Sequence, residues 1–211
     1  MKIKWLGQST FVIKSEQTLV TDPHNPMLGK LPKDLTAKVV TVSHAHVDHN
    51  YTKAIAGSPQ IISKTGSFRS GGFEIKGLAT FHDNVLGKKR GSNIVYVFGV
   101  EGLRLCHLGD LGHLLTDEQL KEIGTIDILM VPVGGFFTID ANEAVEVVNQ
   151  LKPKIVLPMH YKPKGSLIPL PIVGVDKFTE ALGWEVEEVD ELAIDRDALN
   201  SIDHKVALFR K

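Results

Sequence analysis

Short runs of apolar and β-branched residues, separated by turn-forming residues, occupy the first half of the chain. Three of these runs alternate or cluster as strands do, at residues 2–6, 10–14 and 18–22. A fourth run, KVVTVS at residues 38–43, is apolar enough to be a buried strand. Further strand candidates lie at residues 59–63, 73–81, 93–100 and 103–108. The pattern predicts a strand-rich first half, with one short helix at residues 50–56 and Asn50 as its cap.

Helix and strand patterns alternate in the second half. Residues 116–119 (TDEQ) and 140–143 (DANE) both have the spacing of a capping box, and they predict helices ending near residues 123 and 151. The remaining pattern predicts a helix at 175–182 and strands at 126–132, 154–159, 184–189 and 204–210. Because no linker or fixed-period repeat divides the chain, we expect one α/β domain over residues 1–211.

The densest group of reactive side chains is His-Ala-His-Val-Asp-His at residues 44–49, directly after the predicted buried strand. Four candidate metal ligands thus fall within six positions. Imidazole and carboxylate together suit Zn, Mn, Fe or Ni, whereas Ca and Mg prefer oxygen ligands. Three histidines and an aspartate would be costly to bury without a metal or a partner. The motif therefore predicts a transition-metal site.

Other polar residues also follow strand-like runs. Because strand ends converge on one rim of a sheet in α/β proteins, we expect these residues to meet. On extended backbone, His44 and His46 share a face because they are two residues apart. The residues that can supply further ligands by position are His82, Asp110 and His160, with Asp22 and Gly134 at two other strand ends.

This order of residues resembles the metallo-β-lactamase superfamily. The resemblance rests on residues 44–49, then His82, then Gly109-Asp110, then His160. Within the superfamily, the chain is most similar to the branch of small metal-dependent hydrolases that contains ascorbate-6-phosphate lactonases. N-acyl-phosphatidylethanolamine phospholipase D is a more distant relative. Supporting stretches are residues 5–7 (WLG), 21–23 (TDP), 43–44 (SH), 90–93 (RGSN), 107–113 (HLGDLGH) and 132–135 (PVGG). Gln8 departs from the pattern, since many members of this branch carry His there.

The resemblance implies an α/β fold, a four-layer αβ/βα sandwich, with two divalent transition-metal ions at one edge. Zn is expected, and Mn, Fe and Ni are the alternatives. Carried over by position, the first metal would be held by His44, His46 and His82, and the second by Asp48, His49 and His160, with Asp110 bridging the two. Two such ions can activate a bridging hydroxide for attack on carbon or phosphorus, so Asp48 and Asp110 are also assigned to catalysis.

Some of these assignments have alternatives. His107 competes with His82 as the third ligand of the first metal. Its alternative is a histidine next to the site or in the core, hydrogen-bonded to the backbone or to a carboxylate. Asp22 is expected to orient a ligand histidine, and its alternative is a turn residue before Pro23. Asp110 could likewise be a turn residue, and His160 the end of a buried strand. Cys106 is expected in the core.

Candidates for substrate contact lie beside the ligand positions. The basic run Lys88, Lys89 and Arg90 could bind a phosphate or carboxylate, and a solvated basic loop is the alternative. His113 is a candidate general acid, with a surface-loop histidine as its alternative. Further contacts are expected from Asn93, Tyr161 and Lys162. The apolar segment SLIPLPIV at residues 166–173 is expected to wall the pocket, contact another subunit or pack on the sandwich.

Composition limits the kinds of molecule that the protein is expected to bind. The formal net charge of −1 gives no general attraction to nucleic acid, so the expected substrate is a small molecule, anionic if the basic run faces it. The single cysteine indicates a reducing compartment, the cytoplasm, and no stretch has the pattern of a secretory signal or a membrane span. A homo-oligomer is compatible with this composition.

These features predict a dinuclear hydrolase acting on a lactone or phosphodiester. The alternatives are a nuclease of the same superfamily, a non-catalytic metal-binding or sensor protein, and a di-iron redox protein.

Overall fold

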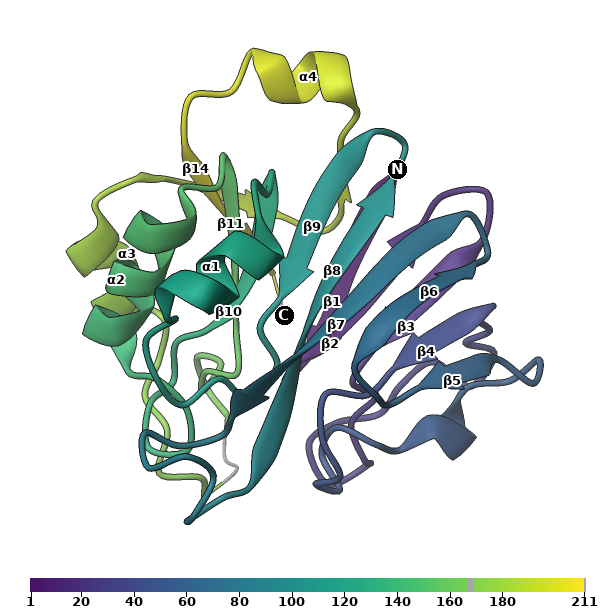
Figure 1. Cartoon of the computed structure of the whole chain (residues 1–211), viewed down its shortest axis with the longest axis horizontal. Coiled ribbons are helices and arrows are strands. Elements are labelled where there is room, and N and C mark those ends of the chain that lie inside the picture. Colours follow the sequence, from purple (N-terminus) through teal and green to yellow (C-terminus); the bar gives the residue numbers. More distant parts are fainter. Residues whose placement is uncertain (167–168, 211) are drawn as a thin grey trace.

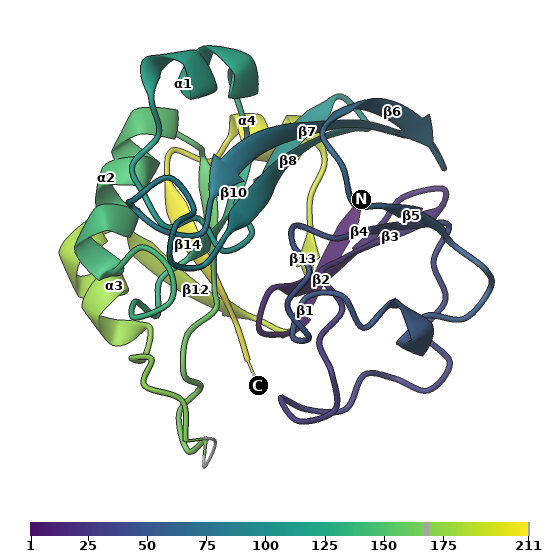
Figure 2. The same cartoon turned by 60° about the horizontal axis from the view of Figure 1, so that its bottom comes forward.

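Two β-sheets packed face to face form the centre of the molecule (Figures 1 and 2). The computed structural model describes residues 1–166 and 169–210. Among these residues, the first sheet has the order β13-β1-β2-β3-β4-β5. Its strands are β1 (Lys2–Gly7), β2 (Thr10–Lys14), β3 (Thr18–Thr21), β4 (Val39–Thr41), β5 (Gln60–Ile62) and β13 (Leu192–Ala193).

The second sheet has the order β12-β14-β11-β10-β9-β8-β7-β6. Its strands are β6 (Gly66–Ser70), β7 (Phe73–Phe81), β8 (Ser92–Val100), β9 (Leu103–His107), β10 (Ile128–Pro132), β11 (Ile155–Met159), β12 (Glu185–Val189) and β14 (Lys205–Phe209). The helices α1 (Asp117–Ile123), α2 (Ala141–Leu151) and α3 (Asp176–Leu182) cover part of its outer face, as Figure 2 shows. The predicted α/β class with two sheets is thus confirmed.

One apolar core fills the space between the two sheets and continues under the helices. Ile3 and Phe11 of the first sheet belong to the same cluster as Phe98 of the second and Phe178 of α3. The buried Tyr96 also joins the sheets, because its hydroxyl donates to the carbonyl oxygens of Val42 and Ile62 at 3.1 and 3.0 Å. Burial of apolar area at roughly 25 cal/mol per Å² is the main force that holds such layers together.

The outer face of the first sheet has a thinner cover. A smaller cluster that includes Val12, Val20 and Val40 packs there under Leu31 and Leu35 of the loop after β3. The short 3₁₀ helix η1 (Thr52–Ala54) lies in the next loop. A helix was expected at residues 50–56, but only this single turn forms. Asn50 does not cap it: its side-chain amide instead donates to the Ala45 carbonyl at 2.8 Å.

Most predicted elements agree with the structure, and both capping boxes are formed. The side chains of Thr116 and Asp140 each accept a hydrogen bond from the main-chain N–H of the third helical residue. The side chain of that residue accepts in turn from the main-chain N–H of Thr116 or Asp140. Three elements were not predicted: β6, β13 and the helix α4 (Arg196–Asn200). All three are short, and β6 has the polar sequence GSFRS without apolar alternation. Length and patterning were therefore too weak to predict them.

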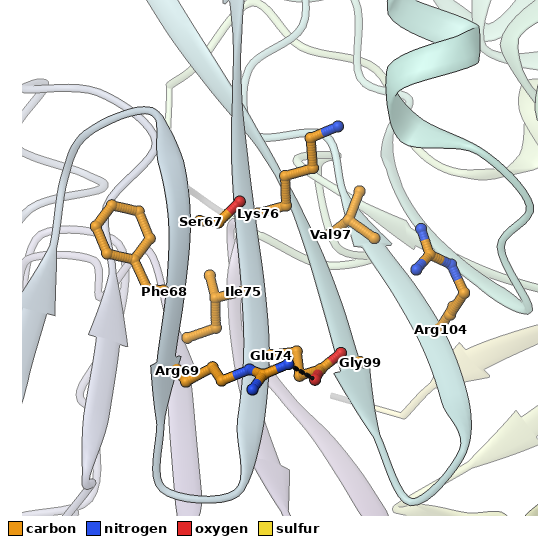
Figure 3. Close-up of a pocket in the computed structure, with 9 residues that line it drawn as sticks. All are labelled: Ser67, Phe68, Arg69, Glu74, Ile75, Lys76, Val97, Gly99 and Arg104. Carbon is orange, nitrogen blue, oxygen red and sulfur yellow. Dashed lines mark hydrogen bonds and ion pairs between the residues drawn. The ribbon is translucent and has the colours of Figure 1, made fainter.

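The outer face of the second sheet is partly exposed at β6 and β7, beside α1, which contacts β7. A shallow cavity of about 410 Å³ lies on this face, lined by Ser67, Phe68, Arg69, Glu74, Ile75, Lys76, Val97, Gly99 and Arg104 (Figure 3). Its cations are already bonded. Arg69 pairs with Glu74 at 2.8 Å, and Arg104 donates to the carbonyl oxygens of Ile123 and Thr125. This cavity contains none of the candidate metal ligands.

Strand direction brings the candidate ligands to one edge. In the second sheet, β9, β10 and β11 are parallel, and β7 has the same direction because β7 and β9 both pair antiparallel with β8. In the first sheet, β3 and β4 are parallel to each other. The loops after these six strands carry Asp22, residues 43–49, His82, Asp110, Gly134 and His160. No helix among the described residues is both long and apolar enough to cross a membrane.

Cys106 lies in the shared core and is fully buried. Burial raises the pKa of its thiol, which keeps the thiol protonated and unreactive. We predict that a disulfide reagent such as dithionitrobenzoate leaves the native protein unmodified and modifies one thiol per chain in denaturing urea. Rapid labelling of the native protein, at a rate independent of urea, would show that Cys106 is accessible.

Candidate metal centre

The candidate ligands form two groups at the edge where the strands end. In the first group are His44, His46 and His82, and in the second Asp48, His49 and His160. A third set, His44, His49 and Asp110, overlaps the two and joins them. Within each group, one ligand atom from every residue lies within 4.8 Å of the others. The division into two triads matches the sets that the resemblance implied, although their roles as ligands stay predictions.

Asp110 lies between the two groups. Its Oδ2 atom faces ring nitrogens of four histidines: 3.2 Å to Nε2 of His82, 3.2 Å to Nε2 of His160, 3.3 Å to Nε2 of His49 and 3.8 Å to Nε2 of His44. The carboxylate is buried, and burial alone would raise its pKa. Electrostatic and hydrogen-bond interactions with His160 and His49 instead hold the pKa of Asp110 well below its usual range. A single oxygen is thus placed where it can serve both groups.

Several buried atoms of these residues lack hydrogen-bond partners among the described residues. They are Nε2 of His44, Nε2 of His49, Nδ1 of His82, Oδ1 of Asp110 and Nδ1 of His160. Buried polar atoms are almost always bonded, so such a concentration needs a physical reason. Nitrogen and oxygen donors around a common space are what a divalent transition metal requires. These residues therefore fit bound metal ions.

The protonation state of His44 also fits metal binding. Burial lowers the pKa of His44 to about 3, so its ring is neutral near pH 7, as a metal ligand must be. Burial would lower the pKa of His49 as well, but the carboxylates of Asp110, Asp22 and Asp48 raise it well above its usual value. The three carboxylates that hold a proton on His49 would equally attract a metal cation.

The comparisons with known proteins agree with this geometry. The model of the β-lactamase superfamily domain matches residues 2–160, which is most of the chain and ends at the last candidate ligand. The chain belongs to the β-lactamase superfamily. A metal-dependent hydrolase of Carboxydothermus hydrogenoformans is 32% identical over 191 residues, which cover 76% of this chain and 84% of that protein. Its family within the superfamily is one of metal-dependent hydrolases, and this chain is a member.

Solved structures of the superfamily show the same fold. A Thermotoga maritima protein, described as a candidate Zn-dependent hydrolase of the metallo-β-lactamase superfamily, has 39% identity and a TM-score of 0.82, covering 100% of this chain and 99% of its own. A metallo hydrolase from Ignicoccus hospitalis has 19% identity and a TM-score of 0.69, covering 98% and 94%. The latter similarity concerns the fold alone.

Two glycines of the candidate metal centre permit close contact between the ligand loops. A Cβ atom added at Gly109 would lie 2.4 Å from Oδ1 of Asn93, and one added at Gly134 would lie 2.1 Å from the His160 carbonyl oxygen. A larger residue would displace Asn93 at the first position and the His160 main chain at the second. Gly109 also has a φ of +56°, which favours glycine. These glycines explain why the ligand loops can approach each other.

Asp22 lies behind two of the candidate ligands. Its Oδ1 accepts from the main-chain nitrogen of Ser43 at 2.7 Å, and its Oδ2 lies 2.9 Å from Nδ1 of His49. The same Oδ2 accepts from the Ser43 hydroxyl, whose oxygen lies 2.9 Å from Nδ1 of His44. Both rings are thereby oriented with Nε2 toward Asp110. The contact predicted between Asp22 and a ligand histidine is present.

His107 has a different position from His82. Its Nε2 lies 2.9 Å from the Ser9 carbonyl oxygen, and its Nδ1 accepts from the Gly109 main chain at 3.2 Å. Both ring nitrogens are therefore engaged, and neither is available to a metal. Of the two alternatives for the first group, the structure brings only His82 to His44 and His46. His107 instead fixes the turn that carries Asp110.

The structure does not support a substrate contact at Asn93. The side chain is fully buried, its Oδ1 accepts from the main chain of Asp110 at 2.9 Å, and its amide donates to the Leu108 carbonyl and the Thr80 hydroxyl. With every polar atom used, Asn93 cannot bind a ligand. Its function is to hold the Asp110 turn, so the sequence assignment is corrected.

The general-acid assignment of His113 is also corrected. Its Nε2 accepts from the Phe81 main chain at 3.2 Å, and its Nδ1 donates to the Leu114 carbonyl at 2.7 Å. These two bonds occupy both nitrogens of the ring. His113 does not line the cavity that contains the candidate ligands. It links the end of β7 to the loop after β9.

A cavity of about 350 Å³, here called the metal cavity, opens onto the two ligand groups. It is lined by Gln8, His46, Asp48, His82, Lys89, Arg90, Asp110, Phe137, His160 and Leu170. Of the basic run, Lys89 and Arg90 reach this cavity and Lys88 does not. Tyr161 and Lys162 line a neighbouring cavity instead. Of the apolar segment at 166–173, Leu167 and Ile168 lie outside the described residues.

The basic loop owes its shape to Asp83, which the sequence reading missed. The Asp83 carboxylate accepts four main-chain N–H groups, those of Val85, Gly87, Lys89 and Arg90, at 2.7–2.9 Å. Burial would raise the pKa of Asp83, but these bonds lower it to about 2. A turn-forming aspartate directly after a ligand histidine and before a glycine was the available signal.

Orientation of the candidate ligands by Asp22 yields a measurable prediction. We expect Asp22→Asn to lower metal affinity about 10- to 100-fold, because the amide cannot accept from both Ser43 and His49. Metal competition against a chromogenic chelator measures this change. Asp34→Asn, in the same loop but exposed, is the matched control and is expected to leave affinity unchanged. Equal affinity for all three proteins would remove this role from Asp22.

Proposed function

We propose that the protein is a dinuclear metal-dependent hydrolase acting on a small anionic ester, either a phosphodiester or a lactone that carries a phosphate or carboxylate. The observation that carries this proposal is the position of Asp110 Oδ2 between two complete ligand triads. A site for one metal would need only one triad. We infer that the two ions would be held by the first and second groups with Asp110 between them.

The chemistry that such a pair supplies is known in general terms. Two divalent ions held together lower the pKa of a bound water toward ~7 and polarise the bond to be cleaved. The chain's own residues then have three tasks. Asp110 fixes the position of the two groups relative to each other. Asp22 and Ser43 orient the rings of His49 and His44. The wall of the metal cavity selects the substrate.

The wall of the metal cavity supports an anionic substrate. Lys89 lines it, and the Lys89 ammonium has no partner among the described residues, so it is free to bind a ligand. Arg90 lies beside it, with its Nη2 donating to the Phe136 carbonyl at 2.8 Å and its guanidinium 5.7 Å from the centre of the Phe137 ring. A fixed guanidinium and a free ammonium are well suited to phosphate or carboxylate oxygens.

No serine or cysteine nucleophile is required by this proposal. Cys106 is buried in the core, away from the metal cavity. A nuclease remains an alternative only if a long polyanion can enter the site, and the chain's net charge of −1 disfavours this.

The proposal predicts both a metal content and a loss of activity. We expect two transition-metal ions per chain by elemental analysis, and a fall of at least about 100-fold in kcat for Asp110→Asn and His46→Ala with bis(p-nitrophenyl) phosphate. The matched control is His204→Ala, which removes an exposed histidine from the start of β14. Protein that binds no transition metal and stays inactive after reconstitution would contradict the proposal.

Recognition of the anion by Lys89 is tested separately. We predict that Lys89→Ala raises KM about tenfold for an anionic phosphodiester, since a bond to a charged group contributes about 1.5 kcal/mol. It should leave the hydrolysis of a neutral lactone unchanged. Lys88→Ala is the matched control, because Lys88 is the neighbouring exposed cation that does not line the metal cavity. An equal effect of both substitutions would reduce the role of Lys89 to general electrostatics.

A further inference from the structure

A second cavity of about 300 Å³ adjoins the metal cavity. It is lined by Gln8, Leu28, Tyr161, Lys162, Pro163, Lys164, Gly165, Ser166, Leu170 and Ile172. Gln8 and Leu170 line both cavities, so the two spaces meet at these side chains. The second cavity contains no candidate metal ligand, and nothing in the proposed hydrolysis uses it so far.

The walls of the second cavity are mainly apolar. Leu28 comes from the loop after β3, whereas Pro163, Leu170 and Ile172 come from the loop after β11. Lys162 and Lys164 complete the lining, and long lysine stems can cover apolar surface while the ammonium stays in water. Apolar concave surface with few polar groups is typical of a binding site for a small molecule.

Tyr161 is held rigidly at this cavity. Its ring stacks on Trp5, with 5.1 Å between ring centroids and 22° between planes. Trp5 in turn donates from Nε1 to the Gln8 carbonyl at 2.9 Å. The Tyr161 hydroxyl has no hydrogen-bond partner among the described residues, although the residue is 6% exposed. One polar group in an apolar wall is thus left to bind a ligand.

Gln8 connects the two cavities to the ligand groups. Its backbone has a φ of +51°, and its carbonyl accepts from the main chain of His160 at 3.0 Å as well as from Trp5. Its side-chain amide donates to Oδ2 of Asp48 at 3.0 Å. A molecule that extends from the metals into the second cavity would therefore pass Gln8, beside the bond to be cleaved.

We propose that the second cavity binds an apolar group of the substrate, so that the substrate is an ester with an anionic centre at the metals and a short alkyl chain or ring on the far side of Gln8. This proposal rests on the proposed function for the position of the anionic centre. It adds a substrate class that neither the metal site nor the family membership specifies.

Binding of alkylphosphonates, which cannot be hydrolysed, tests the proposal independently of activity. For methyl- to hexylphosphonate, calorimetry on the metal-loaded protein should show the dissociation constant falling about fourfold for each added methylene group that enters the cavity. Leu28→Trp fills the cavity and should abolish this dependence on chain length. Met27→Trp is the matched control, because Met27 is 83% exposed and does not line the cavity.

A second variant covers the case in which Leu28→Trp does not fold. Ile172→Ala enlarges the cavity and should move the best chain length upward by one or two methylene groups. Equal affinity for methyl- and hexylphosphonate in the unmodified protein would overturn the proposal. The same series made as p-nitrophenyl phosphodiesters separates the two proposals. Hydrolysis without preference for chain length would overturn the second cavity alone, whereas chain-length-dependent binding without hydrolysis would overturn only the proposed function.

Discussion

The site depends on one buried carboxylate. Asp110 has been removed from water at a large desolvation cost, and four histidine nitrogens within 3.8 Å of its Oδ2 compensate for this. The compensation requires that loops from both sheets end at one point. Every other feature of this edge, including the direction of β7 and β9 and the absence of a side chain at Gly109, serves that convergence. The same arrangement that balances the charge of Asp110 creates the space for metal ions.

A layer of fully bonded polar residues behind the ligands holds them in place. Asp22 orients His49 and Ser43, His107 holds the turn at Gly109, and Asn93 holds the main chain of Asp110. Each of these groups has its hydrogen bonds completed by the chain itself. Five of the candidate ligands, by contrast, retain a buried atom without a hydrogen-bond partner among the described residues: His44, His49, His82, Asp110 and His160. The supporting residues therefore complete their hydrogen bonds within the chain, whereas these five keep polar atoms that a metal could use.

Much of the fold and the ligand set could be predicted from the sequence, because both depend on local pattern. Buried strands and capping boxes are contiguous signals, and the histidine motif lies within six residues. Side-chain direction in loops is not local. Asn93 and His113 flank the ligand positions along the chain, yet both face main-chain groups. The anchoring of the basic loop by Asp83 depends on four N–H groups whose directions only the folded loop defines. Short polar elements such as β6 lack a periodic signal altogether.

Gln8 lies where the metal cavity and the second cavity meet, and its chemistry can be compared with that of a histidine at the same position. A histidine at this position could offer a ring nitrogen to a metal or exchange a proton near pH 7. The amide of Gln8 can do neither in practice: its Nε2 donates to Asp48 and leaves the charge of that carboxylate in place. Gln8 therefore places an uncharged side chain at the boundary between the metal cavity and the second cavity. An uncharged side chain at this boundary permits an apolar group to lie beside the reacting centre. A charged imidazolium would disfavour this, because the apolar group would remove water from the charge at a cost in free energy.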